Sequence, residues 1–99
     1  MSLPRYAFNR AAVEHAPEEP GIYGLFDGTE MIYIGRASRE HTIKECLLRH
    51  QDGAHGECTM KAAFYTWEIT PWPAARETEV LARFRAMNHR DPRCQDKAA

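Results

Sequence analysis

Residues 21–35 read GIYGLFDGTEMIYIG. Two short apolar runs in this stretch flank a polar step from Asp27 to Glu30. An Asp-Gly pair between such runs is a strong hairpin signal, because glycine accepts the positive φ that a tight turn needs. We therefore predict two antiparallel strands, residues 21–26 and 31–35, closed by a tight turn.

Each predicted strand carries one tyrosine, Tyr23 or Tyr33. Whether the two rings share a face depends on the register of the hairpin, which the sequence alone leaves open. Taken by themselves, tyrosines in a hairpin are expected to pack in the core or across the strands. A role in a functional site needs support from the rest of the chain.

The composition is that of an ordinary globular protein. Of the 99 residues, 43% are apolar and 27% are charged, so we expect one domain over residues 1–99 with one modest core. The formal net charge of −1 gives no global attraction to nucleic acid, so a polyanion would bind through a local patch or a metal ion. Apolar runs fall well short of the ~20 residues of a membrane span, and we expect no membrane contact.

The cysteines bear on the cellular compartment. There are three, an odd and small number, which favours a reduced protein over a disulfide framework. They are Cys46, Cys58 and Cys94. Because the sequence also shows no signal-peptide pattern, we predict a cytoplasmic location.

Capping residues, breakers and periodicity define the other elements. Asn9 is suited to cap the first helix, and Ser38 or Thr42 the second. Outside the hairpin we predict helices over residues 9–16, 43–50 and 74–88, a helical turn over 60–64 and a strand over 64–70. The predicted fold is α/β, a sandwich in which a small three-stranded antiparallel sheet is flanked by helices.

The two longer predicted helices each have an apolar face. On the first, the residues at the spacing of one face are Ile43, Cys46, Leu47 and His50. On the second, the apolar stripe is Val80, Leu81, Phe84 and Met87. Extending that stripe backward by three and four residues reaches Glu77, whereas Glu79 lies about 100° round from Val80. We therefore expect the Glu77 carboxylate to point toward the packed face.

The tripeptides at residues 21–23 and 33–35, Gly-Ile-Tyr and Tyr-Ile-Gly, resemble the signature of the GIY-YIG nuclease superfamily. The lead-in Pro-Glu-Glu-Pro at residues 17–20 is similar to that of the N-terminal catalytic domain of excision-repair endonucleases. A basic residue after the second tripeptide, Arg36, and the closing Pro-Arg-Cys-Gln at residues 92–95 also fit. The resemblance implies a GIY-YIG-like sandwich that acts on DNA, with DNA repair as the related process.

This resemblance covers residues 17–95 and implies hydrolysis of a DNA phosphodiester with one divalent cation, Mg²⁺ or Mn²⁺. Glu77 would hold the cation, with Glu79 in reserve, and Tyr23 and Tyr33 would position or deprotonate the attacking water. The reaction needs cationic stabilisation of the developing charge and a base for water. A tyrosine, with its unperturbed pKa near ~10, can be that base only beside a cation. A single carboxylate leaves most of the metal shell to water and substrate, which suits Mg²⁺.

Arg36, Arg49 and His50 would surround the phosphate. The family keeps an arginine on the helix after its second motif, and here Cys46 stands at that position. Arg49 lies three residues on and can deliver a guanidinium from the next turn of the helix. If it does not, the alternative is a catalytically silent module of this fold that binds nucleic acid or a protein partner. Gln95 stands where the family often closes with asparagine, and it keeps the amide.

A third hypothesis is a zinc-bound interaction module. Cys46, His50, His55 and Cys58 form a Cys-x3-His-x4-His-x2-Cys series, and its i, i+4 pair on a helix is a spacing that zinc sites use. The competing interpretation is that Cys46 fills the apolar helix face and that the others are loop residues.

A basic cluster gathers near the C-terminus and consists of Arg83, Arg85, Arg90 and Arg93 with His89. It is either a solvated helix face or a phosphate-contacting patch whose affinity depends on salt. Trp67 and Trp72 are expected to pack in the core or at its rim. Because the chain is short and nearly neutral, specificity would come from DNA structure, a protein partner or a homodimer.

Overall fold

The computed structural model describes residues 3–96, and most of its elements overlap the predicted ones, but the first helix is shorter than the predicted residues 9–16. In chain order they are β1 (Tyr6–Ala7), α1 (Arg10–Val13), β2 (Gly21–Asp27), β3 (Glu30–Ala37), α2 (Ile43–Gln51), α3 (Glu57–Met60), β4 (Phe64–Ile69) and α4 (Pro73–Asn88). The predicted α/β class is confirmed. No helix in residues 3–96 is both long and apolar enough to cross a membrane.

The sheet has four strands, not the predicted three, in the order β1-β4-β2-β3. All neighbouring strands are antiparallel. The additional strand is β1, which pairs with β4 through Tyr6 opposite Tyr65 and Ala7 opposite Phe64. Because β1 is two residues long and both are exposed, it carries no alternation from which a strand could be predicted.

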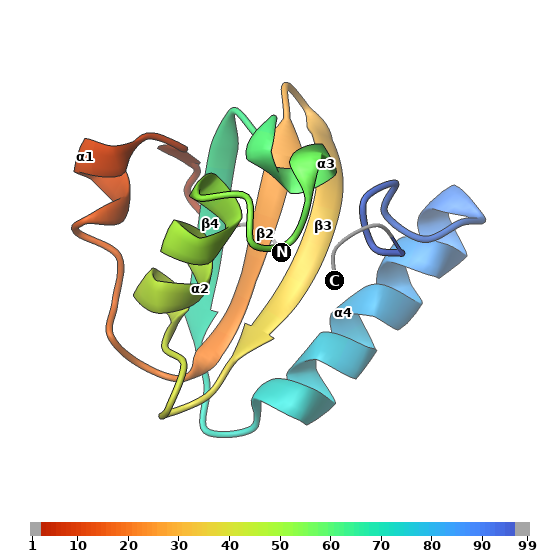
Figure 1. Cartoon of the computed structure of the whole chain (residues 1–99). Coiled ribbons are helices and arrows are strands. Elements are labelled where there is room, and N and C mark those ends of the chain that lie inside the picture. Colours follow the sequence, from red (N-terminus) through yellow and green to blue (C-terminus); the bar gives the residue numbers. More distant parts are fainter. Residues whose placement is uncertain (1–2, 97–99) are drawn as a thin grey trace.

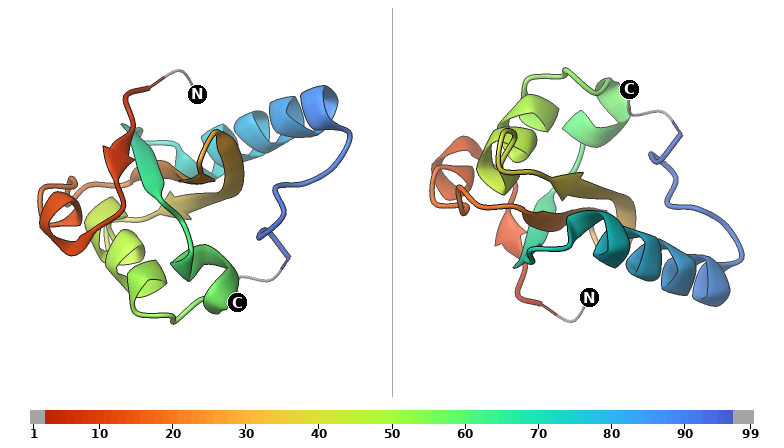
Figure 2. Two further views of the ribbon diagram at one scale, coloured as in Figure 1. Left: turned by 90° about the horizontal axis from the view of Figure 1, so that it is seen from above. Right: turned by 90° about the horizontal axis from the view of Figure 1, so that it is seen from below.

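The sheet forms a middle layer between helices. Figure 1 and the two views of Figure 2 show α4 on one face and α1, α2 and α3 on the other. On the α4 face, Val80 packs against Ile22 and Ile34. The larger cluster lies on the opposite face, and its buried members include Val13, Tyr23, Leu25, Ile43, Leu47 and Tyr65. Two apolar layers therefore hold the sheet.

The predicted hairpin is confirmed, and its strands are longer than expected. Asp27 pairs with Glu30 across a turn in which Gly28 has a φ of +63°. This backbone conformation is in the left-handed region, where a side chain would be strained. The Asp-Gly signal therefore identified the turn for the correct physical reason.

A register shift inside the hairpin decides which way Tyr33 points. Near the turn, Phe26 pairs with Met31, but the next pair is Leu25 with Tyr33, so Ile32 is an extra residue in β3. If the register of the turn continued, Tyr33 would lie opposite Gly24, on the other face from Tyr23. The bulge instead brings both tyrosines to the face that α2 covers, and their ring centroids are 6.1 Å apart.

The caps of the first two helices agree with the prediction. The Asn9 side chain accepts a hydrogen bond from the Ala12 backbone N–H, and Thr42 accepts one from Glu45. Thr42 is thus the α2 cap, whereas Ser38 Oγ accepts from the His41 backbone N–H in the preceding loop. The four predicted residues of the α2 face are all buried: Ile43, Cys46, Leu47 and His50.

Two predictions about the second half of the chain were wrong in detail. The short helical turn is α3, which ends at Met60, so it precedes the predicted range of residues 60–64. On α4 the stripe is buried at Val80 but not at Met87, which is 75% exposed. The last turns of α4 extend beyond β3 in Figure 1. The apolar stripe of α4 therefore has no sheet to pack against at Met87.

The two tryptophans differ. Trp67 is half-buried and stacks on Tyr6, with ring centroids 6.4 Å apart. Trp72, just before α4, is 73% exposed, so its predicted place in the core or rim was wrong.

The segment after α4 returns across the edge of the sheet. Figure 2 shows it leaving the end of α4, passing β3 and approaching α3 on the opposite face. The Cys94 backbone N–H donates to Ile32 O (2.9 Å). The Gln95 amide accepts from Ile34 N–H (3.0 Å) and donates to Ile34 O (2.7 Å). The tail thus satisfies the edge strand on both sides of Tyr33.

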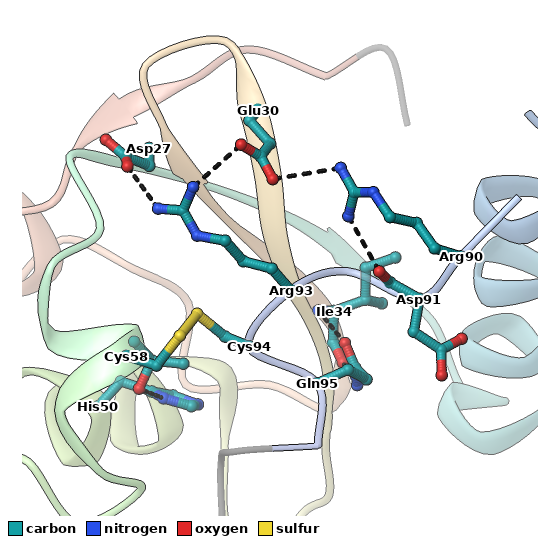
Figure 3. The surroundings of a disulfide bond; sticks show 11 residues. Asp27, Glu30, Ile34, His50, Cys58, Arg90, Asp91, Arg93, Cys94 and Gln95 are labelled. Atoms are coloured by element: carbon teal, nitrogen blue, oxygen red, sulfur yellow. Dashed lines mark hydrogen bonds and ion pairs between the residues drawn. A yellow bond between two sulfur atoms is a disulfide. The ribbon is translucent and has the colours of Figure 1, made fainter. Parts of the chain in front are cut away.

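The prediction that all cysteines are reduced was wrong. Cys58 in α3 and Cys94 in the tail form a disulfide, with their Cα atoms 5.6 Å apart, and Cys46 is free (Figure 3). The pair is separated by 36 residues, and it meets only because the tail crosses the sheet edge. Composition does not contain that information.

A candidate active site at the edge of the sheet

A cavity of about 580 Å³ opens where β3, α2 and the start of α4 meet. Five of the six residues predicted for a site line it: Tyr23, Tyr33, Arg36, Arg49 and Glu77. The sixth, His50, is fully buried behind the cavity. The remaining lining residues include Ser38, His41, Pro73 and Ala74, which were not proposed as site residues, and Cys46 and His55, which belong to the zinc hypothesis.

Tyr23 enters the cavity over a glycine. It pairs with Gly35 across the hairpin, and a Cβ on Gly35 would lie 2.4 Å from Tyr23 Cζ and 2.5 Å from its Oη. Both distances are far below van der Waals contact, so position 35 must lack a side chain for the phenol to lie there. The need for glycine at position 35, in the second tripeptide, is therefore explained by the position of Tyr23, in the first.

The hydroxyl of Tyr23 belongs to a short buried chain of hydrogen bonds. Its Oη lies 2.9 Å from His50 Nε2, and His50 Nδ1 lies 2.8 Å from Thr59 Oγ1. His50 and Thr59 are both fully buried. Burial, with a smaller contribution from nearby His55, lowers the pKa of His50 to about 3, so this imidazole is neutral at physiological pH.

Both tyrosines keep their protons at neutral pH. Burial raises the pKa of Tyr23 well above its usual value, and the neighbouring Tyr33 adds to the increase. Burial also raises the pKa of Tyr33, and the negative charge of Glu77 contributes. At neutral pH these residues are therefore neutral hydrogen-bonding groups, and neither is a ready base.

Glu77 faces the cavity from the first turns of α4. Burial raises the pKa of its carboxyl, and the positive charge of Arg36 opposes that increase. Arg36 Nη1 lies 3.9 Å from Glu77 Oε1, outside hydrogen-bonding distance, and the glutamate side chain is only 20% exposed. Glu79, by contrast, is mostly exposed and forms an ion pair with Arg76. Of the two carboxylates, Glu77 is the one at the cavity.

A small hard cation fits this carboxylate. The described residues give the Glu77 side chain an ion pair with Arg36 but no hydrogen bond, so its oxygens are available toward the cavity. Mg²⁺ is commonly held by one or two carboxylates together with water and substrate phosphate, and the cavity has room for both. Glu77 is therefore the residue of this cavity that could hold a single Mg²⁺ or Mn²⁺, with water or substrate as the other ligands.

A zinc site has no such basis. Within residues 3–96 there is no group of three or more His, Cys, Asp or Glu side chains arranged to hold a metal. Cys58 is bonded to Cys94, and both ring nitrogens of His50 already have partners. The Cys-x3-His-x4-His-x2-Cys series is thus divided between a disulfide, a buried hydrogen-bond chain and the cavity wall.

Two arginines reach the cavity from opposite sides. Arg36 comes from β3, and Arg49 comes from α2, where it is held by a 3.1 Å ion pair with Glu45. The Cys46 thiol also lines the cavity, and burial raises its pKa, so it is a neutral thiol at physiological pH. The guanidinium of Arg49 therefore lines the cavity one turn beyond the cysteine.

The basic cluster near the C-terminus is largely neutralised within the protein. Arg93 forms ion pairs with Asp27 and Glu30, and Arg90 with Glu30 (Figure 3). Arg85 pairs with Asp91. The contacts of Arg90 and Arg93 fasten the tail to the tip of the hairpin, which is a structural explanation for part of a cluster that the sequence left open as a phosphate patch.

Thr59 is the site residue that sequence reasoning missed. It lies in a four-residue helix, and a single threonine there carries no chemical signature.

Comparisons of this chain with protein-family models, with curated proteins and with solved structures each found no match.

Proposed function

We propose that this chain is a divalent-metal-dependent endonuclease of the GIY-YIG type, which hydrolyses DNA phosphodiester bonds. The observation that carries the proposal is that residues from three elements line one cavity. They are Tyr23 from β2, Tyr33 and Arg36 from β3, and Glu77 from α4. These are the residues to which the sequence resemblance assigns the water, the phosphate and the metal. Excision-type DNA repair is the process in which we expect such an activity.

The chemistry of the residues supports phosphodiester hydrolysis. Arg36 and Arg49 can donate hydrogen bonds to the phosphate oxygens from two sides of the cavity and offset their negative charge. The hydroxyls of Tyr23 and Tyr33 can hold a water near the phosphorus, because both are protonated and reach the cavity. When bound at Glu77, Mg²⁺ would supply a water of lowered pKa and stabilise the charge that develops on the phosphate.

Plasmid nicking in Mg²⁺ or Mn²⁺ tests the proposal. We expect the wild-type protein to nick, and Glu77→Gln to lower the rate at least about 100-fold, because it removes the carboxylate that we propose holds the cation. Glu79→Gln is the matched control, since Glu79 is on the same helix but paired with Arg76. Nicking that persists in Glu77→Gln, or is independent of added metal, would refute the proposed mechanism.

The alternative is a module of this type that binds nucleic acid or a protein partner, with or without self-association, without cutting. Cys46 favours it, because a neutral thiol lines the cavity where the related nucleases have a guanidinium. Fluorescence anisotropy with labelled DNA in EDTA measures binding apart from cleavage. Binding without nicking, together with nicking gained in Cys46→Arg, would establish the alternative.

A further inference from the structure

We propose that Thr59 is a positioning residue for Tyr23. Through His50, it sets the direction of the Tyr23 hydroxyl, so that the phenol O–H points into the cavity as a hydrogen-bond donor. The part of this proposal that concerns activity rests on the proposed function, whereas the part that concerns protonation does not.

Two hydrogen bonds connect Thr59 to Tyr23 through His50. Thr59 Oγ1 lies 2.8 Å from His50 Nδ1, and His50 Nε2 lies 2.9 Å from Tyr23 Oη. Thr59 and His50 are fully buried, so bulk water does not compete for these atoms. Tyr23 itself is buried but lines the cavity, so the series of hydrogen bonds from Thr59 ends at a residue of the cavity wall.

A neutral imidazole carries one N–H, so its two hydrogen bonds must run in the same direction. If Nδ1–H donates to Thr59, then Nε2 accepts the Tyr23 O–H, and the phenol hydrogen points away from the cavity. If Thr59 O–H donates to Nδ1, then Nε2–H donates to Tyr23 Oη, and the phenol hydrogen is left for the cavity. The choice between these arrangements depends on what Thr59 does with its own hydrogen.

Thr59 has a single acceptor within reach. Among the hydrogen bonds of residues 3–96, the one that involves Thr59 Oγ1 is the bond to His50. A buried hydroxyl hydrogen without an acceptor costs about 1–3 kcal/mol, so Thr59 donates to Nδ1. Nε2 then carries the imidazole proton. Tyr23 accepts from His50, and its O–H is left for the cavity side, where Tyr33, Cys46 or the oxygen of a bound water or phosphate can accept it.

The short helix that carries Thr59 is itself fixed in place. Its neighbour Cys58 is bonded to Cys94, whose segment runs along β3 (Figure 3). The position of Thr59 relative to the sheet is therefore set by a covalent bond. A hydroxyl held in this way can determine the protonation of a partner on α2.

The first test is the tautomer of His50 in the wild-type protein. Long-range ¹H–¹⁵N correlation spectra distinguish a protonated ring nitrogen from an unprotonated one, and we expect Nε2 to be protonated and Nδ1 not. A protonated Nδ1 would overturn the proposal. This measurement requires neither DNA nor metal, so it stands even if the protein does not cleave DNA.

The second test uses Thr59→Val, which keeps the shape and removes the hydroxyl, with Thr59→Ser as the conservative control. We expect Thr59→Val to slow nicking about tenfold, the effect of one lost hydrogen bond, and Thr59→Ser to stay within about twofold of wild type. In a Tyr23→Phe background Thr59→Val should have no further effect, because the relay ends at that hydroxyl. Equal losses in both backgrounds would show a merely structural role and contradict the proposal.

Discussion

Tyr23 and Gly35 face each other across the β2–β3 hairpin so closely that a methyl group on Gly35 would overlap the phenol oxygen. The hydroxyl of Tyr23 is therefore held between a backbone on one side and His50 on the other. Its position is determined by packing as well as by hydrogen bonding, and it can be perturbed through either.

Gly35→Ala is expected to destabilise the fold by about 1–3 kcal/mol, because the added methyl group must displace a buried ring. Urea denaturation measures the change. Gly28→Ala is the control: no atom lies within 4 Å of its Cβ, so only the positive φ should contribute, at about 1–2 kcal/mol. A Gly35→Ala variant as stable as the wild type would contradict the packing described here.

Glu77→Gln should lower the pKa of Tyr33. Burial and the negative charge of Glu77 both raise this pKa, and the substitution removes the charge while it keeps the volume. Spectrophotometric titration of the phenols, compared with a Tyr33→Phe reference, reports the shift. Glu79→Gln should leave the titration unchanged, because that carboxylate is paired with Arg76 away from the cavity.

The stability of the protein should fall between pH 6.5 and pH 3 partly through His50. Its pKa is 6.5 when unperturbed and about 3 in the fold, so in this window the unfolded chain binds a proton that the folded protein does not. The contribution is fully present above pH 6.5 and is lost as the pH falls, by up to about 5 kcal/mol. Denaturation curves of His50→Gln, which cannot titrate, should show a correspondingly smaller pH dependence.

Reduction of the disulfide should lower the free energy of unfolding. Cys58 and Cys94 are separated by 36 residues, and opening a loop of that length releases about 4 kcal/mol of chain entropy in the unfolded state. Thermal melts with and without dithiothreitol measure the loss. The Cys58→Ser/Cys94→Ser variant should match the reduced protein and should no longer respond to the reagent.

If the proposed function holds, the lining of the cavity predicts which arginines bind DNA. Arg36→Ala and Arg49→Ala should each weaken binding and reduce the salt dependence of the affinity by about one phosphate contact. Arg93→Ala should not weaken binding, because Arg93 is not among the residues that line the cavity and is paired with Asp27 and Glu30 at the tip of the hairpin. Anisotropy titrations at several salt concentrations compare the three variants. If Arg93→Ala weakens binding more than Arg36→Ala and Arg49→Ala do, the DNA-binding surface lies at the tail and not at the cavity.

Much of the framework could be predicted from local patterns. The turn at Gly28 and the buried face of α2 depend on residues close together in sequence, and both predictions are confirmed. The placement of Tyr33 beside Tyr23 could not be predicted, because the extra residue Ile32 reverses the facing and carries no signal of its own. A bulge is decided by what packs on both faces of a strand, which a short window does not contain.

The other missed features share one cause, since they depend on contacts between distant segments. The disulfide joins Cys58 to Cys94 only after the tail has crossed β3. Thr59 matters only because α3 then lies behind His50. Glu77, by contrast, could be placed from helix geometry alone, and it lines the cavity as expected, although its role there remains a proposal.

The amide of Gln95 has a further consequence for solubility. β3 lies at the end of the strand order, and Gln95 and Cys94 occupy hydrogen-bonding groups of Ile34 and Ile32 that a foreign strand would otherwise use. An uncovered edge strand is a template for intermolecular β-pairing and aggregation. The same tail that supports the strand beneath Tyr33 therefore also protects the molecule from association through this edge.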